Sequence, residues 1–206
     1  MDRPAPATVD LSALYPAPSP LAKAKQIDHL DKHCRRFVEL SPFLCLGSTN
    51  AEGKTDVSPR GDPPGFVKVL DAKTLAIPDR PGNNRIDSIK NLVDHPQVGM
   101  IFFIPGIEET LRVNGRAELS RDSDLLASMT VEGKPPKLAI VVHVEEAFLH
   151  CAKALKRSRL WDASRHQPRN VLPSLAQMIV DQTKAPNIDV AEADARIEKA
   201  YKETLY

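Results

Sequence analysis

Short strand patterns follow one another at hairpin spacing through the middle of this 206-residue chain. Runs of apolar, β-branched and aromatic residues are separated by turn residues, and helical patterns do not alternate with them. Strands are expected at residues 43–49, 55–58, 66–70, 74–77, 98–104, 109–119 and 138–149. This spacing predicts a mainly β fold with helices (α+β), built as an antiparallel barrel. It argues against a nucleotide-binding βαβ fold, in which strands and helices alternate.

The turns and helices are placed by the residues between these runs. Gly53 suits a hairpin loop at residues 50–54, and three prolines predict a rigid loop at residues 59–65. Gly115 is a candidate β-bulge in its long strand. Apolar residues at helical spacing predict helices at residues 21–40, 85–93, 121–129, 172–183 and 190–205.

Composition divides the chain and limits its partners. We expect a proline-rich extended arm at residues 1–20, a barrel domain at 21–165 and a helical extension at 166–206 packed on the barrel. A net charge of +1 offers no global attraction for nucleic acid or an anionic membrane. No apolar run approaches a membrane span, and the N-terminus lacks a signal-peptide pattern. Three widely spaced cysteines suit a reducing cytoplasm.

Residues 78–91 join an apolar strand to an amphipathic helix, and their chemistry is that of an anion site. Backbone N–H groups at a helix start are unpaired and partly positive, and arginine adds donors that match phosphate oxygens. The candidate ligands are Arg80, Asn83, Asn84, Arg85 and Ser88. The alternative is local: one of the two asparagines caps the helix and the arginines are solvated.

The proline-stiffened segment at residues 58–61 is a second candidate arm of the same site. Ser58, Pro59, Arg60 and Gly61 come at the end of a predicted strand. An arginine on a preformed loop loses little entropy when it binds an anion. The alternative is a stabilising turn with an exposed arginine, and the residues alone leave both interpretations open.

Other motifs in the sequence are weaker evidence for a binding site. Residues 47–55 resemble a phosphate-binding loop, but the spacing between its glycines is too long and a strand follows where a helix is required. His29 and His33 are spaced to hold a metal on one helix, but a solvated helix face is the simpler interpretation, so no metal is predicted. No nucleophile with a partner base stands out, and the catalytic residues remain unknown. A binding site without a protein nucleophile indicates a cofactor that carries the chemistry.

Three motifs together resemble the pyridoxamine 5'-phosphate oxidase-like FMN-binding split barrels, in a bacterial subgroup that differs from the true oxidases. They are Ser-Pro-Arg-Gly-Asp at residues 58–62, Ile-Pro-Asp-Arg-Pro-Gly-Asn-Asn-Arg at 77–85, and the stretch from Phe148 to Trp161. The resemblance covers residues 25–165 and implies an antiparallel split β-barrel with helical extensions at both ends.

The resemblance also implies a homodimer with two FMN molecules at the subunit interface. By position, Arg85 and Ser88 are expected to bind the FMN phosphate, with residues 58–61 along the flavin or its ribityl chain. Thr110 falls where a polar side chain approaches the ring. Residues that would close the pocket from the second subunit are Lys156, Arg157, Ser158 and Trp161.

The implied function is an FMN-dependent oxidoreductase of unknown small-molecule substrate. The oxidases' C-terminal substrate signature is missing, and residues 162–206 add helices that the oxidase does not need. The substrate of the true oxidases is therefore not expected here. The alternatives are a split barrel that binds flavin without turnover, or one that binds haem or a deazaflavin coenzyme.

Overall fold

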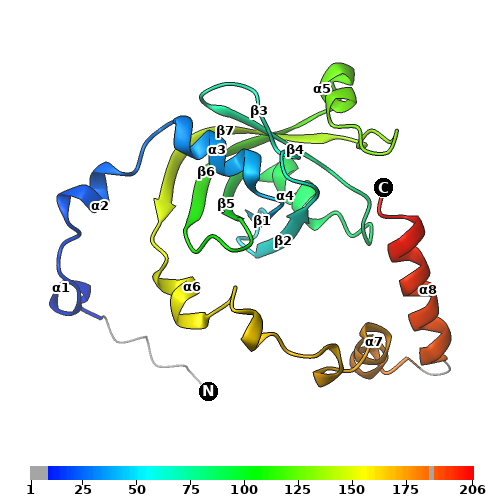
Figure 1. The fold of residues 1–206 in the computed structure, drawn as a ribbon. Coiled ribbons are helices and arrows are strands. Elements are labelled where there is room, and N and C mark those ends of the chain that lie inside the picture. Colours follow the sequence, from blue (N-terminus) through cyan, green and yellow to red (C-terminus); the bar gives the residue numbers. More distant parts are fainter. Residues whose placement is uncertain (1–8, 186–187) are drawn as a thin grey trace.

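The computed structural model describes residues 9–185 and 188–206 (Figure 1). Seven strands form one antiparallel sheet in the order β2–β1–β5–β6–β7–β4–β3. Their bounds are β1 Phe43–Thr49, β2 Thr55–Gly61, β3 Lys68–Val69, β4 Thr74–Pro78, β5 Gln97–Phe103, β6 Thr110–Ser120 and β7 Ala139–His150. The predicted antiparallel α+β fold is confirmed.

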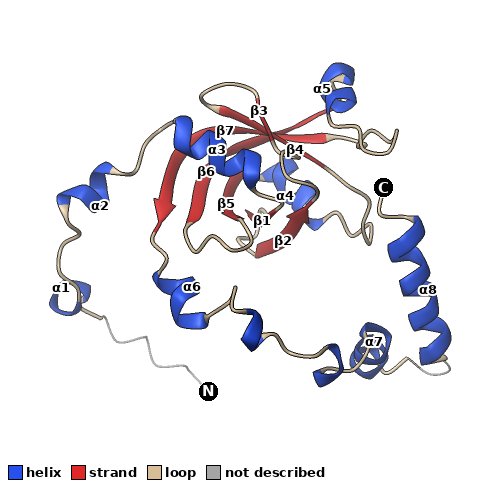
Figure 2. Ribbon diagram, viewed as in Figure 1, coloured by secondary structure: helices blue, strands red, loops and turns tan. Residues whose placement is uncertain are grey.

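The sheet curls into a barrel that does not close (Figure 2). Within the described part of the chain, β2 and β3 end the sheet and do not pair with each other, so the barrel is split. Alternate strand residues point inward and are fully buried, among them Leu46, Met100, Phe102, Val113 and Ile140. Two helices, α3 Lys32–Leu40 and α4 Asp87–Asp94, bury apolar residues in the same core.

Strand β2 is longer than the sequence predicts. It continues through Pro59 to Gly61, so the expected loop at residues 59–65 begins only after the strand. Pro59 is tolerated because β2 is an edge strand, where a missing N–H group costs no ladder hydrogen bond. The correction matters for the site, because a strand fixes which side chains share a face.

The single helix expected at residues 21–40 is wrong. The structure has a short helix α2 Pro20–Ala24, an irregular stretch, and then α3. Between them Ile27 forms a β-bridge with Ala147, which holds this stretch against the end of β7 in an extended form. The carboxylate of Asp31 then caps α3 by accepting from two backbone N–H groups.

This break also separates the two histidines considered for a metal site. His29 lies in the irregular stretch, where its Nδ1 is 3.0 Å from a carboxylate oxygen of Asp28, whereas His33 lies on α3. Among the residues that the structure describes, no three His, Cys, Asp or Glu side chains gather as metal ligands would.

The bulge predicted at Gly115 is confirmed, since the β6–β7 register shifts between Asn114 and Gly115. The remaining helices are between 4 and 14 residues long. They are α1 Leu11–Leu14, α5 Ser123–Ser128, α6 Lys153–Ser158, α7 Leu175–Thr183 and α8 Val190–Glu203, with 3-10 turns at Ala163–Arg165 and Arg169–Val171. The helices expected at 121–129, 172–183 and 190–205 are thus present with slightly shorter bounds. None of the described helices is long and apolar enough to cross a membrane.

The extension after α6 runs away from the barrel and then comes back to it (Figure 1). Helices α7 and α8 pack against each other through Ala176 and Ala193, which are both buried. The segment returns to the barrel at Tyr206, whose side chain and backbone bond to Asp62 and Lys134. Among the described residues, the hydrogen bonds between the extension from residue 166 onward and the barrel are those of Tyr206.

Candidate functional site

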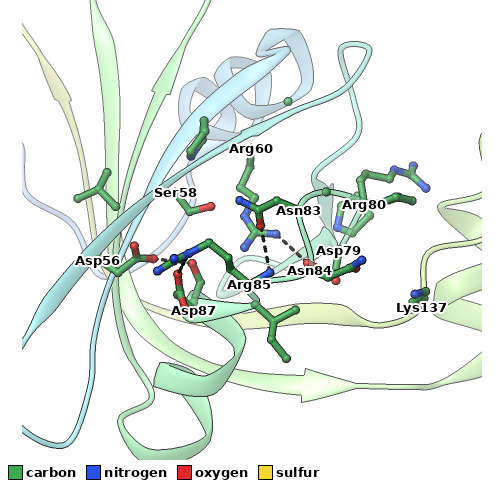
Figure 3. Close-up of a pocket in the computed structure, with 18 of the residues that line it drawn as sticks. Asp56, Ser58, Arg60, Asp79, Arg80, Asn83, Asn84, Arg85, Asp87 and Lys137 are labelled. Atoms are coloured by element: carbon green, nitrogen blue, oxygen red, sulfur yellow. Dashed lines mark hydrogen bonds and ion pairs between the residues drawn. The ribbon is translucent and has the colours of Figure 1, made fainter. Parts of the chain in front are cut away.

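A cavity of about 530 Å³ lies where the barrel is split, between β2 and the segment that follows β4. This volume is within the ~300–1,000 Å³ usual for small-molecule sites. Its lining residues come from three regions: residues 56–61 with Phe66, residues 78–88, and Lys137 (Figure 3). The two segments predicted from the sequence, residues 58–61 and 78–91, therefore contribute to one pocket.

Strand β2 supplies one wall. The side chains of Asp56, Ser58 and Arg60 alternate with exposed neighbours and are half-buried on the face that lines the pocket. Nη1 of Arg60 is 2.8 Å from a carboxylate oxygen of Asp79, just beyond β4. An ion pair thus joins the two sides of the split (Figure 3).

A second ion pair bridges the same gap. Nε of Arg80 is 2.6 Å from a carboxylate oxygen of Asp62, whose side chain is only 1% exposed. Nη2 of Arg80 also donates to the backbone carbonyl of Met129. Because both ends of its guanidinium are engaged, Arg80 braces the wall of the pocket that it lines.

The start of α4 has an unusual backbone. The residue before the helix, Ile86, has a φ of 52°, and Asn84 has a φ of 58°. A β-branched residue in this left-handed region is strained, and such strain gathers at functional sites. The helix therefore begins at Asp87 rather than at Arg85 as the sequence predicts.

The same helix start has no cap. No side chain among the described residues bonds to the free N–H groups of its first turn. The alternative in which Asn83 or Asn84 caps the helix is thus wrong. Instead, the Oδ1 atom of Asn83 accepts from the backbone N–H of Arg85 and shapes the preceding turn. Free N–H groups at a helix start form an anion-binding site.

Two predicted phosphate ligands lie at this end of the pocket. Arg85 is 72% exposed and uses only Nε, which bonds to Asp87, so its terminal nitrogens remain available. Ser88 is buried, and its hydroxyl donates to a carboxylate oxygen of Asp56 at 3.0 Å. Two donor side chains and the carboxylates of Asp56 and Asp87 therefore lie together at the start of α4.

Arg60 has spare donor capacity as well. Its Nε is buried and has no hydrogen-bond partner in the part of the chain that the structure describes. A buried polar atom without a partner costs free energy unless a ligand or water satisfies it. The pocket thus holds one unsatisfied donor midway along β2.

Sequence reasoning missed four charged residues of the pocket: Asp56, Asp79, Asp87 and Lys137. The two-residue period of β2 signals Asp56, because it shares a face with Ser58 and Arg60. No local sequence pattern identifies Lys137. It lies between α5 and β7, and only the tertiary structure brings it to the pocket. Lys137 forms no ion pair with any described residue, whereas the three lining arginines are each paired with an aspartate.

The other expected ligands lie elsewhere in the chain. Thr110 is buried at the start of β6, opposite His150, and does not line the pocket. Lys156 and Trp161 line a separate pocket of about 510 Å³, where the indole N–H donates to the carbonyl of Ile107. Arg157 and Ser158 lie on α6 and line neither pocket.

Comparison with known proteins gave one family match. The model of the family described as pyridoxamine 5'-phosphate oxidase matches residues 30–151, which is more than half of the chain. No curated protein matches the sequence.

Several solved structures resemble the barrel. HupZ from Group A Streptococcus is 18% identical over 58% of this chain and 92% of its own, with a TM-score of 0.46. An FMN-binding protein from Syntrophomonas wolfei is 9% identical over 57% of this chain and 88% of its own, with a TM-score of 0.44. The haem storage protein HutZ from Vibrio cholerae is 17% identical over 59% of this chain and 93% of its own, with a TM-score of 0.41.

Proposed function

Because the chain belongs to the pyridoxamine 5'-phosphate oxidase family of split barrels, we propose that it binds FMN in the pocket at the split and uses it as an oxidoreductase. Bound FMN would supply electron or hydride transfer to a small-molecule substrate. The chain's own residues would bind the phosphate, orient the ring system and exclude water.

The observation that carries this proposal is the uncapped, strained start of α4, which lines the pocket beside Arg85 and Ser88. A phosphate would accept from free N–H groups, from the terminal nitrogens of Arg85, and from the Ser88 hydroxyl once that hydroxyl rotates away from Asp56. Charge-assisted bonds contribute roughly 1.5–3 kcal/mol each, so three or four would support about micromolar affinity or better. The unsatisfied Nε of Arg60 would meet the ligand farther along β2.

The direct test is spectroscopic. Freshly purified protein, before and after incubation with FMN, is expected to show flavin absorbance that stays with the protein through gel filtration. Anaerobic NADH or NADPH, followed by air, then tests for turnover: bleaching and recovery of the flavin bands are expected of an oxidoreductase. A protein that remains colourless after incubation with FMN contradicts the proposal, and one that binds FMN without reduction by either donor would be a flavin carrier.

Haem is the poorer candidate for this pocket. Among its described lining residues there is no His, Cys, Met or Tyr that could serve as an axial iron ligand. A deazaflavin coenzyme has different absorption bands from FMN, and a parallel titration with it would identify that ligand instead.

Substitution of Asp56 tests where the phosphate of FMN lies. Its carboxylate accepts from Ser88 and would sit close to a bound dianion, which it repels. Asp56→Asn keeps an acceptor for Ser88 but removes the charge, so we expect FMN to bind about threefold to tenfold tighter, as loss of a partly screened like charge implies.

The measurement for Asp56→Asn is a fluorescence titration with FMN at two ionic strengths. The gain should shrink at high salt, because salt screens charge repulsion. Asp124→Asn is a suitable control, since this carboxylate lies on α5 outside the pocket lining. Unchanged or weaker FMN binding by Asp56→Asn would place the phosphate elsewhere.

We also propose that the protein is a homodimer, in keeping with its family. The outer face of the sheet carries a row of half-buried side chains across four strands: Cys45, Ile101, Arg112 and Phe148. The guanidinium of Arg112 lies 3.9 Å from the centre of the Phe148 ring. Its Nε is buried and unpaired among the described residues. A contiguous, partly apolar face of this kind is typical of a protein interface.

Ile101→Lys tests this interface. A charge in the centre of the row is expected to halve the molar mass measured by light scattering, because an unpaired buried charge opposes association. Val93→Lys is the matched control, since Val93 is an exposed residue of α4 outside this face. If Ile101→Lys keeps its circular dichroism spectrum and still forms dimers, the proposed interface is wrong.

A further inference from the structure

The end of the C-terminal extension contacts the wall of the candidate pocket through a small polar cluster. The hydroxyl of Tyr206 donates to one carboxylate oxygen of Asp62 at 2.6 Å, while Arg80 donates to the other. The ring of Tyr206 also lies beneath the guanidinium of Arg80, whose central carbon is 5.4 Å from the ring centre. One residue of the extension therefore holds both members of a buried ion pair.

A third contact fixes the backbone of the same residue. Nζ of Lys134 donates to the backbone carbonyl of Tyr206 at 2.9 Å. Lys134 lies in the tight turn before β7, and Lys137 of the same connection lines the pocket. Tyr206 thus joins three parts of the chain: the end of β2, the segment after β4 and the connection between α5 and β7.

The burial of Asp62 and the pKa of Tyr206 both indicate that the hydrogen bond between these two side chains is stable. Asp62 is 1% exposed, and an isolated buried carboxylate is costly unless donors surround it. The hydrogen bond to Asp62 raises the pKa of the Tyr206 hydroxyl, so this hydroxyl remains a donor. Removing it leaves a buried acceptor site on Asp62 without one of its partners.

The connection to the pocket runs through Arg80. This residue lines the cavity, and its position is set by Asp62, the carbonyl of Met129 and the ring of Tyr206. Helices α7 and α8, by contrast, pack on each other. The extension is consequently anchored at its end, in the manner of a strap (Figure 1).

We propose that the described residues of the extension, 166–185 and 188–206, form a strap that Tyr206 fastens to the wall of the pocket, and that the fastened strap positions Arg80 and slows the release of the bound cofactor. The inference rests on the proposed FMN site and adds regulation of that site. Tyr206 is a positioning residue, since it acts through Asp62 and Arg80 and does not itself line the cavity. Because coupling between two sites is reciprocal, bound FMN should in turn hold the strap in place.

The experiment uses the full chain and three variants, with FMN as the ligand. Tyr206→Ala removes the ring and the hydroxyl, whereas Tyr206→Phe keeps the ring on Arg80. Tyr201→Phe is the matched control, because Tyr201 is an exposed tyrosine on α8. We expect the FMN dissociation rate to rise about tenfold in Tyr206→Ala, about threefold in Tyr206→Phe, and not in the control.

Hydrogen exchange of residues 188–205, with and without FMN, supplies the readout that a merely structural role would not move. FMN should slow exchange there in the wild type and in the Tyr201→Phe control, but not in Tyr206→Ala. If Tyr206→Ala misfolds, Tyr206→Phe alone decides. The inference is overturned if FMN release is unchanged, or if release changes but FMN leaves exchange in the wild-type strap unaltered. A wild type that binds no FMN overturns the proposed function, and the strap inference with it.

Discussion

Replacing Arg85 and Ser88 together by alanine is expected to raise the dissociation constant for FMN about 100-fold or more. The two side chains lie at the uncapped start of α4 and would contribute two charge-assisted hydrogen bonds to the phosphate. Loss of two such bonds costs at least ~3 kcal/mol, which corresponds to about a hundredfold in affinity. The measurement is titration of flavin fluorescence or absorbance with the purified variant.

This double variant is expected to remain folded. Arg85 is largely exposed, and its ion pair with Asp87 contributes little to stability. The control is Arg36→Ala with Ser128→Ala, which removes the same two residue types from exposed positions on α3 and α5. If the Arg85 and Ser88 variant binds FMN as tightly as this control, the phosphate does not lie at the start of α4.

Gly115→Ala is expected to destabilise the barrel by about 3 kcal/mol or more, at the upper end of the effect of overpacking a core. A Cβ atom at Gly115 would lie 2.1 Å from the backbone carbonyl oxygen of His143, on the neighbouring strand β7. Both atoms belong to backbone in the bulged part of the β6–β7 pair, so a side-chain rotation cannot relieve the clash. Denaturant unfolding followed by circular dichroism would measure the loss.

Gly99→Ala is the matched control, because Gly99 lies opposite Asn114 on the adjacent strand β5. Its added Cβ would meet the side-chain oxygen of Asn114 at 3.3 Å, which a small movement of that side chain relieves. We expect a cost of less than about 1 kcal/mol, as for tolerated packing changes. Equal stability of the two variants would mean that the β6–β7 bulge differs from the one described.

The sequence was sufficient to predict the strands because their periodicity is local. In β6 the apolar residues Leu111, Val113 and Ala117 alternate with polar ones, and this alternation is visible without knowing the partner strand. The helix at residues 21–40 was predicted wrongly because a long-range bridge between Ile27 and Ala147 overrides its helical spacing. The length of β2 was underestimated because Pro59 is tolerated only at an edge, and sequence does not reveal which strand lies there.

The two segments that line the site could also be predicted from the sequence, but their contacts with each other could not. Arginine, asparagine and serine at a strand-to-helix junction identified one wall, and the motif around Arg60 identified the other. Their pairing with Asp79 and Asp62 across the split depends on tertiary structure, as does the approach of Lys137. The left-handed Ile86 is also hidden, because nothing in its residue type favours that conformation. Placement of Lys156, Arg157, Ser158 and Trp161 in the same site stays a prediction, since it requires a second subunit.

If the start of α4 binds the phosphate of FMN, the protein should distinguish FMN from riboflavin, and a paired titration with the two flavins measures this difference. Riboflavin has the same ring and ribityl chain without the phosphate, so the ratio of the two dissociation constants isolates the phosphate interaction. We expect FMN to bind at least about 100-fold more tightly in the wild type, as two or more charge-assisted bonds imply. The ratio should fall towards one in the Arg85 and Ser88 variant. Equal affinity of the wild type for the two flavins would mean that the start of α4 does not bind the phosphate.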